Sequence, residues 1–108
     1  MSNITARYNE AEKLKNSGQP EDAAKVLQGL LEDEPTHALS HMALARILTG
    51  LGQHEEAVSH AEKACELEPS DAINFSLLSL TYQRAYAGTG DMRYIRMAED
   101  AMARSRQL

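Results

Sequence analysis

The chain repeats itself at an interval of 34 residues, and few folds are compatible with that period. The matches fall mostly on small, apolar or chain-breaking residues, which control how helices pack and where they end. A unit of this length has room for two helices and a turn, so the sequence predicts an array of helix–turn–helix units. The matched pairs are Ala11 with Ala45, Leu14 with Leu48, Gly18 with Gly52, Gln19 with Gln53, Glu21 with Glu55, Ala23 with Ala57, and Pro35 with Pro69.

Glycine, proline and small polar residues mark the helix ends that we expect. Gly18 suits a helix C-terminus because it tolerates positive φ, and Pro20 suits a helix start because its missing N–H is not needed there. Thr36 and Ser70 are the expected N-caps of later helices. The helices are predicted near residues 4–16, 21–33, 37–51, 54–67, from about 71, and near 91–105.

Each predicted helix carries an apolar stripe of helical period. Within the second helix, Ala23, Val26, Leu27, Leu30 and Leu31 share one face. Small residues recur at Ala11, Ala45 and Ser79, where two helix backbones can approach closely. We therefore expect a large residue at position 45 to overpack the helix crossing.

The third unit departs from this pattern. Its turn glycines are delayed to Gly88 and Gly90, which predicts a first helix longer by about one turn and then a loop over residues 87–90. The sequence ends at Leu108, which leaves no room for a polar capping helix after the third unit. Because an uncapped array exposes apolar surface at its end, self-association or end-stacking is one hypothesis.

Taken together, these residues resemble the tetratricopeptide repeat. Its pattern is visible in His41-x2-Leu44-Ala45-x2-Leu48, followed by Gly52, Ala57, Ala61, Ala64 and Pro69. The third unit offers Phe75-x2-Leu78-Ser79-x2-Tyr82. The resemblance implies an all-α, right-handed α-solenoid of six helices in one domain spanning residues 1–108. Its three repeats would cover residues 4–35, 38–69 and 72–105, with the lengthened segment at 84–90.

The resemblance also implies a concave groove, lined by the first helix of each unit, that binds a peptide or a partner helix. The residues expected to line it are the first-helix positions not used for packing, although some of them could instead fill the interfaces between repeats. These candidates are Tyr8, Asn9, Glu12, Leu39, Met42, Ala43, Arg46, Ile73, Leu77 and Leu80.

One branch of the family grips a C-terminal carboxylate with Lys, Asn, Asn, Lys and Arg. Only Asn9 matches that set, and Thr5, Ala43, Ile73 and Leu77 hold the other positions. The expected ligand is therefore an apolar peptide or an amphipathic helix of a protein partner, held by side-chain anchors. The alternative is a structural scaffold whose groove or C-terminal end is buried in a homodimer.

Composition narrows the function further. The net charge of −5 disfavours nucleic-acid binding, although residues 84–108 hold five arginines against three acidic residues. Those arginines either contact an acidic partner or line a solvated last helix. No apolar run is long enough to span a membrane, and the single cysteine, Cys65, allows no internal disulfide, so we expect a cytoplasmic protein.

Chemical alternatives find little support in the sequence. His37 and His41 have a spacing that can chelate a metal, but no third ligand is evident, and they are interpreted as surface residues near a helix start. Cys65 is interpreted as a packing residue. Tyr82, Tyr86 and Tyr94 form either an aromatic patch or a core pair with Tyr86 partly exposed. We expect neither a cofactor nor enzymatic activity.

Overall fold

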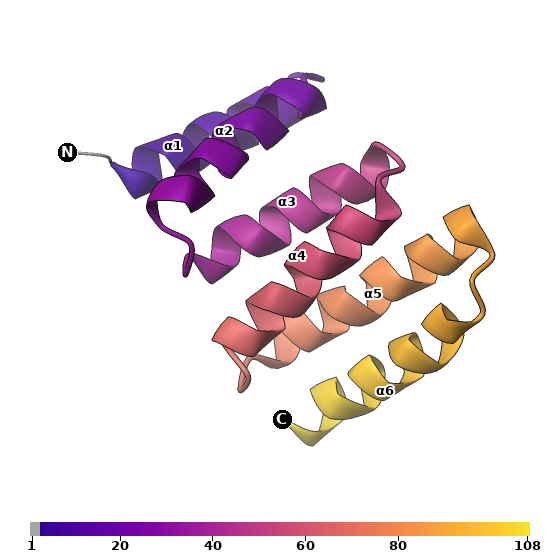
Figure 1. Ribbon diagram of the computed structural model, residues 1–108. Helices are drawn as coiled ribbons and strands as arrows, with labels where there is room; N and C mark the ends of the chain where they lie inside the picture. The colour runs from indigo at the N-terminus through magenta and orange to yellow at the C-terminus, as the bar shows by residue number, and fades with distance from the viewer. Residues whose placement is uncertain (1–2) are drawn as a thin grey trace.

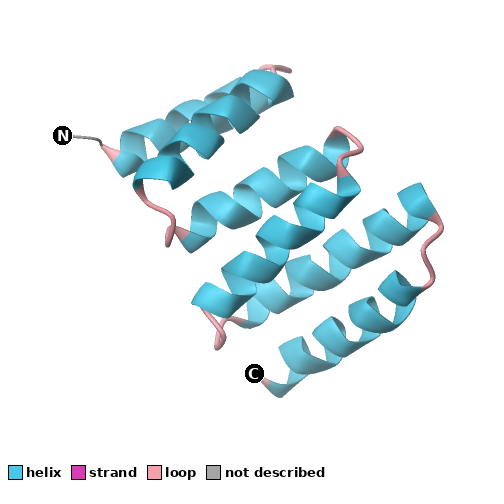
Figure 2. Ribbon diagram, in the orientation of Figure 1, coloured by secondary structure: helices cyan, strands magenta, loops and turns pink. Residues whose placement is uncertain are grey.

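The computed structural model describes residues 3–108, which fold into six α-helices without any strand (Figures 1 and 2). Met1 and Ser2, the first two residues of the predicted domain, lie outside the described part. The helix bounds agree with the sequence predictions to within two residues, apart from the end of the fifth helix. The helices are α1 (Ile4–Asn16), α2 (Pro20–Asp33), α3 (Ala38–Gly50), α4 (His54–Leu67), α5 (Ala72–Thr89) and α6 (Arg93–Gln107).

The predicted turn residues act as expected, whereas the predicted N-caps do not. Gly18 and Gly52 adopt φ of 78° and 77°, a region that residues with a Cβ avoid. The predictions for Thr36 and Ser70 were wrong, because helices α3 and α5 begin one residue later. Their N-caps are His37 and Asp71, and the Asp71 carboxylate accepts hydrogen bonds from two backbone N–H groups of α5.

The helices stack as three antiparallel pairs in chain order, from α1–α2 at one end to α5–α6 at the other (Figure 1). Helix α2 packs on α3, α4 packs on α5, and the first helices α3 and α5 also touch each other. Two apolar clusters form the core, one around Leu27, Leu30 and Leu44 and the other around Ala61 and Tyr82. Helices α3 and α4 contribute to both clusters, so the middle pair joins the two halves of the array.

The small residues predicted to lie between helices are buried. Ala11 and Ala45 are fully buried, and Ser79 is 1% exposed. The Ser79 hydroxyl donates a hydrogen bond of 2.8 Å to the carbonyl oxygen of Ala98, which ties α5 to α6. Because a buried hydroxyl is costly without a partner, this bond explains how serine replaces alanine in the third pair.

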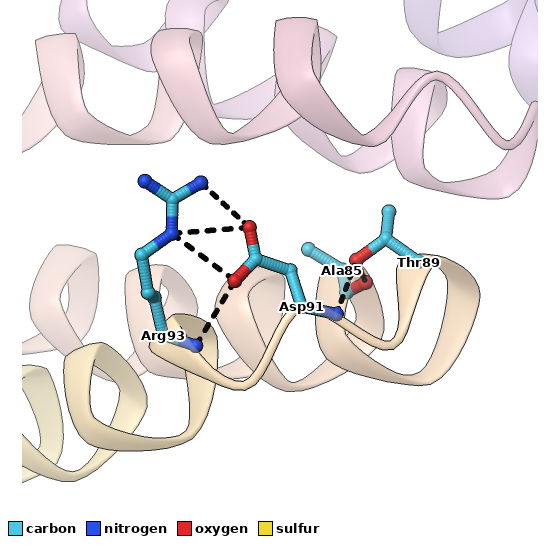
Figure 3. A network of polar contacts seen from close by, with 4 residues as sticks. All are labelled: Ala85, Thr89, Asp91 and Arg93. Carbon is cyan, nitrogen blue, oxygen red and sulfur yellow. Dashed lines mark hydrogen bonds and ion pairs between the residues drawn. The ribbon is translucent and has the colours of Figure 1, made fainter.

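The connection between α5 and α6 differs from the predicted loop. Residues 87–89 are helical, and only Gly90, at φ 73°, turns the chain. The Thr89 hydroxyl donates a hydrogen bond to the carbonyl oxygen of Ala85 and accepts one from the backbone N–H of Asp91 (Figure 3). The Asp91 carboxylate accepts hydrogen bonds from the backbone N–H and the guanidinium group of Arg93. These local bonds satisfy the backbone of the last turn, so α5 continues past the position where α1 and α3 end.

Candidate groove on the first-helix face

A cavity of about 540 Å³ opens between the first helices α3 and α5, beside the start of α4. We call it the α3–α5 cavity. Its wall includes Arg46 from α3, His54 from α4, and Leu77, Leu80 and Arg84 from α5. Arg46 and Leu80 are related by the 34-residue repeat, so they occupy equivalent positions on neighbouring helices. The cavity therefore brings three of the predicted groove residues, Arg46, Leu77 and Leu80, into one place.

The ten predicted groove residues differ widely in exposure. Leu39, Ile73 and Leu80 are 57%, 70% and 43% exposed, which is unusual for large apolar side chains. Met42 and Ala43 are only 3% and 8% exposed, so they support the repeat interfaces and do not offer surface to a ligand. The remaining five are the exposed Asn9 and Arg46 and the half-buried Tyr8, Glu12 and Leu77.

Polar side chains dominate the part of the face that α1 contributes. Glu12 forms an ion pair with Lys15 at 3.3 Å, and the Tyr8 ring meets the edge of His37 at 6.1 Å between centroids. Burial raises the pKa of Tyr8, with a smaller contribution from the charge of Glu12 and an opposing one from Arg46. A smaller cavity of about 350 Å³, lined by Lys15 and Arg46 among others, lies between this part and α3.

Sequence reasoning missed Arg84, His54 and Gly88 as groove residues. Arg84 lies one helical turn beyond Leu80 on α5, and the interval of four residues was a signal that could have placed it on the same face. It was instead grouped by charge with the other arginines of residues 84–108. Gly88 lies against the imidazole of His54, where any Cβ would collide with the ring.

A second cavity, of about 530 Å³, lies between α5 and α6 and contains none of the predicted groove residues. Ile95 and Tyr86 line it, with 37% and 39% of their surface exposed. Tyr82 is buried and stacks on Tyr94 at 6.0 Å between centroids. Of the two predicted alternatives, the tyrosines therefore form a core pair, Tyr82 with Tyr94, and Tyr86 is exposed.

His41 is not the surface residue that the sequence predicted, whereas His37, the N-cap of α3, is half-buried. His41 is 8% exposed, because it bridges α3 to α4 and to the preceding turn. Its Nδ1 lies 3.0 Å from Nδ1 of His60, and its Nε2 lies 2.8 Å from the carbonyl oxygen of Pro35. In the neutral pair, His41 donates to Pro35 through Nε2 and accepts from His60 through Nδ1.

We expect this histidine pair to make the free energy of unfolding fall as the solution is acidified. Burial, followed by the charge of His41, lowers the pKa of His60, while Glu56 opposes the shift. The unfolded chain therefore binds the proton first, and stability is lost as pH falls through about 6.5. Urea unfolding between about pH 7.5 and about pH 5.5, where carboxylates stay ionised, measures the loss. The profile of His60→Gln should be flatter, and an equally steep profile would contradict the assignment.

Other reactive groups on the described chain are engaged in packing. Nδ1 of His37 lies 2.6 Å from Oγ of Ser40, but Ser40 is fully buried and no substrate can reach it. Burial raises the pKa of the Cys65 thiol to about 11, which keeps it protonated and unreactive near neutral pH. Within residues 3–108, no group of three or more potential ligands could hold a metal ion. No helix in the same range is long and apolar enough to cross a bilayer.

Comparison with known proteins agrees with this architecture. Residues 14–80, more than half of the chain, match the tetratricopeptide repeat family. The chain belongs to the tetratricopeptide repeat family. Proteins of this family are typically interaction modules that bind other proteins or peptides. No curated protein matches the chain in sequence.

Two solved structures are similar to this tetratricopeptide repeat chain. The crystal structure of MamA protein superposes with a TM-score of 0.73 at 16% identity, over 96% of this chain and 57% of its own. The crystal structure of YrrB, described as a TPR protein with an unusual peptide-binding site, gives a TM-score of 0.67 at 21% identity. The match covers 93% of this chain and 58% of YrrB. The chain thus spans less than two thirds of either structure, and the likeness establishes the fold.

Proposed function

We propose that the chain is a non-enzymatic interaction module whose first-helix face binds an apolar peptide or an amphipathic helix of another protein. The observation that carries the proposal is the exposure of Leu39, Ile73 and Leu80 on the layer of first helices, where Leu80 also lines the cavity of about 540 Å³. Large apolar side chains grouped on a surface gain free energy when a partner removes them from water. The cavity beside Leu80 can receive a protruding side chain of that partner.

Family membership supports a protein or peptide ligand. YrrB, which shares the fold, is described as having an unusual peptide-binding site, and by analogy a peptide is the ligand class to test first. Buried Ser40 and the raised pKa of Cys65 support a module without catalysis. The proposal includes a cytoplasmic location, which the single cysteine supports.

Leu80→Ser should weaken peptide binding about tenfold, because it removes an exposed apolar anchor at the cavity. The probe is a phage-displayed library of random 12-residue peptides selected on the wild-type chain. Selected peptides are then synthesised, and their affinities are measured by fluorescence anisotropy. Leu80 suits this test because it is exposed, whereas Leu77 packs against the second core cluster and its loss would disturb the fold.

Ile95→Ser is the matched control, since Ile95 is similarly exposed but lines the cavity between α5 and α6. It should leave the affinity within about twofold of wild type, as expected for a residue outside the contact. Loss of binding in Ile95→Ser alone would place the site in that other cavity. Light scattering tests the alternative of a homodimer, and a dimer that Leu80→Ser dissociates would mean that a second copy occupies the face.

A further inference from the structure

The α3–α5 cavity is basic, although the chain as a whole has a net charge of −5. Arg46 and Arg84 both line it together with His54, and no aspartate or glutamate of the described chain does. Acidic residues lie nearby but outside the cavity: Glu55 and Glu56 line a neighbouring cavity at the start of α4, and Glu12 of α1 is paired with Lys15. The local charge thus has the opposite sign to the overall charge, and a ligand in the cavity meets the local one.

Neither arginine is neutralised by the rest of residues 3–108. Three other arginines have partners: Arg7 pairs with Asp33, Arg93 pairs with Asp91, and Arg104 lies over the Phe75 ring. Arg46 and Arg84 form no hydrogen bond or ion pair with any described residue, and both are exposed. Two unpaired guanidinium groups beside apolar surface provide strong donors for carboxylate oxygens.

Apolar side chains lie in the same wall. Leu80 occupies the position on α5 that Arg46 occupies on α3, and Arg84 follows one turn later. Leu77 completes the apolar part of the wall and packs against the core beneath it. A ligand that matched this arrangement would place an apolar side chain against the leucines. It would also carry two anionic groups, one for Arg46 on α3 and one for Arg84 on α5.

We propose that the segment bound at this face is an acidic peptide, in which carboxylates received by Arg46 and Arg84 flank an apolar side chain seated on Leu77 and Leu80. This inference rests on the proposed function, because it names the chemistry of the ligand at the same site. A nucleic acid fits less well, since its many phosphates would face the acidic remainder of the chain. A short acidic segment confines its charge to the cavity.

The experiment uses the full chain and the random 12-residue display library. Peptides that bind wild type but not Leu80→Ser should be enriched in aspartate and glutamate on both sides of an apolar residue. For a chosen peptide, a twin with asparagine and glutamine at the acidic positions should bind about tenfold more weakly at low salt. The difference should shrink as salt is added, because exposed ion pairs are screened.

Protein variants test the same contacts from the other side. Arg46→Gln and Arg84→Gln should each lower the affinity for the acidic peptide about three- to tenfold and leave that for the amide twin unchanged. Arg46→Lys should recover part of the loss, since it restores the charge. Arg96→Gln is the matched control, because it makes the same charge change on exposed α6, outside both cavities.

The outcomes separate this inference from the proposed function. If peptides depend on Leu80 but the amide twin binds equally well, the proposed function stands and the acidic specificity is wrong. If Arg96→Gln weakens binding as much as Arg46→Gln and Arg84→Gln, the effect is long-range charge and the direct contacts are wrong. If the library yields no peptide that depends on Leu80, both the proposed function and this inference fail.

Discussion

Leu44→Ala is expected to lower the free energy of unfolding by about 3 kcal/mol. Leu44 is fully buried in the first core cluster, on helix α3, which contributes to both clusters. Removing three carbon atoms there loses transfer free energy and leaves a cavity that surrounding helices fill only in part. For a domain of this size the loss is a large share of the total stability, which is typically about 5–15 kcal/mol. Urea unfolding followed by circular dichroism measures it.

Leu39→Ala is the matched control for that experiment. It makes the same chemical change on the same helix, but Leu39 is 57% exposed, so we expect a loss below about 0.5 kcal/mol. If Leu44→Ala lowered the free energy of unfolding no more than Leu39→Ala, Leu44 would not be part of a packed interior.

Ala45→Leu should destabilise the fold by about 1–3 kcal/mol, although it adds apolar surface to the core. Ala45 has no exposed surface and belongs to the second core cluster, and the recurring small residues predict a close helix approach there. Three extra carbon atoms would force the helices apart or push the new side chain out of its preferred rotamers. Thermal and urea unfolding of the purified variant measure the change.

The exposed Ala103 of α6 provides the comparison. In Ala103→Leu the larger side chain extends into solvent, and leucine has a helix propensity similar to that of alanine. The free energy of unfolding should therefore stay within about 0.5 kcal/mol of wild type. A stabilising effect of Ala45→Leu would show that an unfilled space exists beside Ala45. In that case, the close approach inferred from the recurring small residues would be wrong.

Most of the fold could be predicted because the signals for it are local. Gly18 and Gly52 adopt the positive φ that their position in the repeat required, and Pro20 begins α2 as its ring geometry favours. The small residues at Ala11 and Ala45 are buried where the repeat placed them. The exceptions are also local, because the N-cap and the end of α5 depend on side-chain bonds of Asp71 and Thr89 for which several residues compete.

The groove was harder to predict, since helical period alone does not distinguish a covered position from an open one. Met42 and Leu39 lie on the same predicted face, yet the neighbouring helices bury the first and leave the second exposed. Arg84 was missed because its charge was counted with the C-terminal arginines, whereas in the structure it lines the same cavity as Leu80. His41 was misjudged because its partner His60 comes from another helix.

By itself, the sequence determined the helices, their pairing into repeats and the small residues at their crossings. These features follow from backbone preferences and from a period that recurs within the chain. Only the tertiary structure decided which first-helix residues remain open, and which charges gather around them. That outcome depends on how much of each helix its neighbours cover, which is a property of the stacked array and of no single segment. The cavity that brings Arg46 and Arg84 together with Leu80 arises in this way.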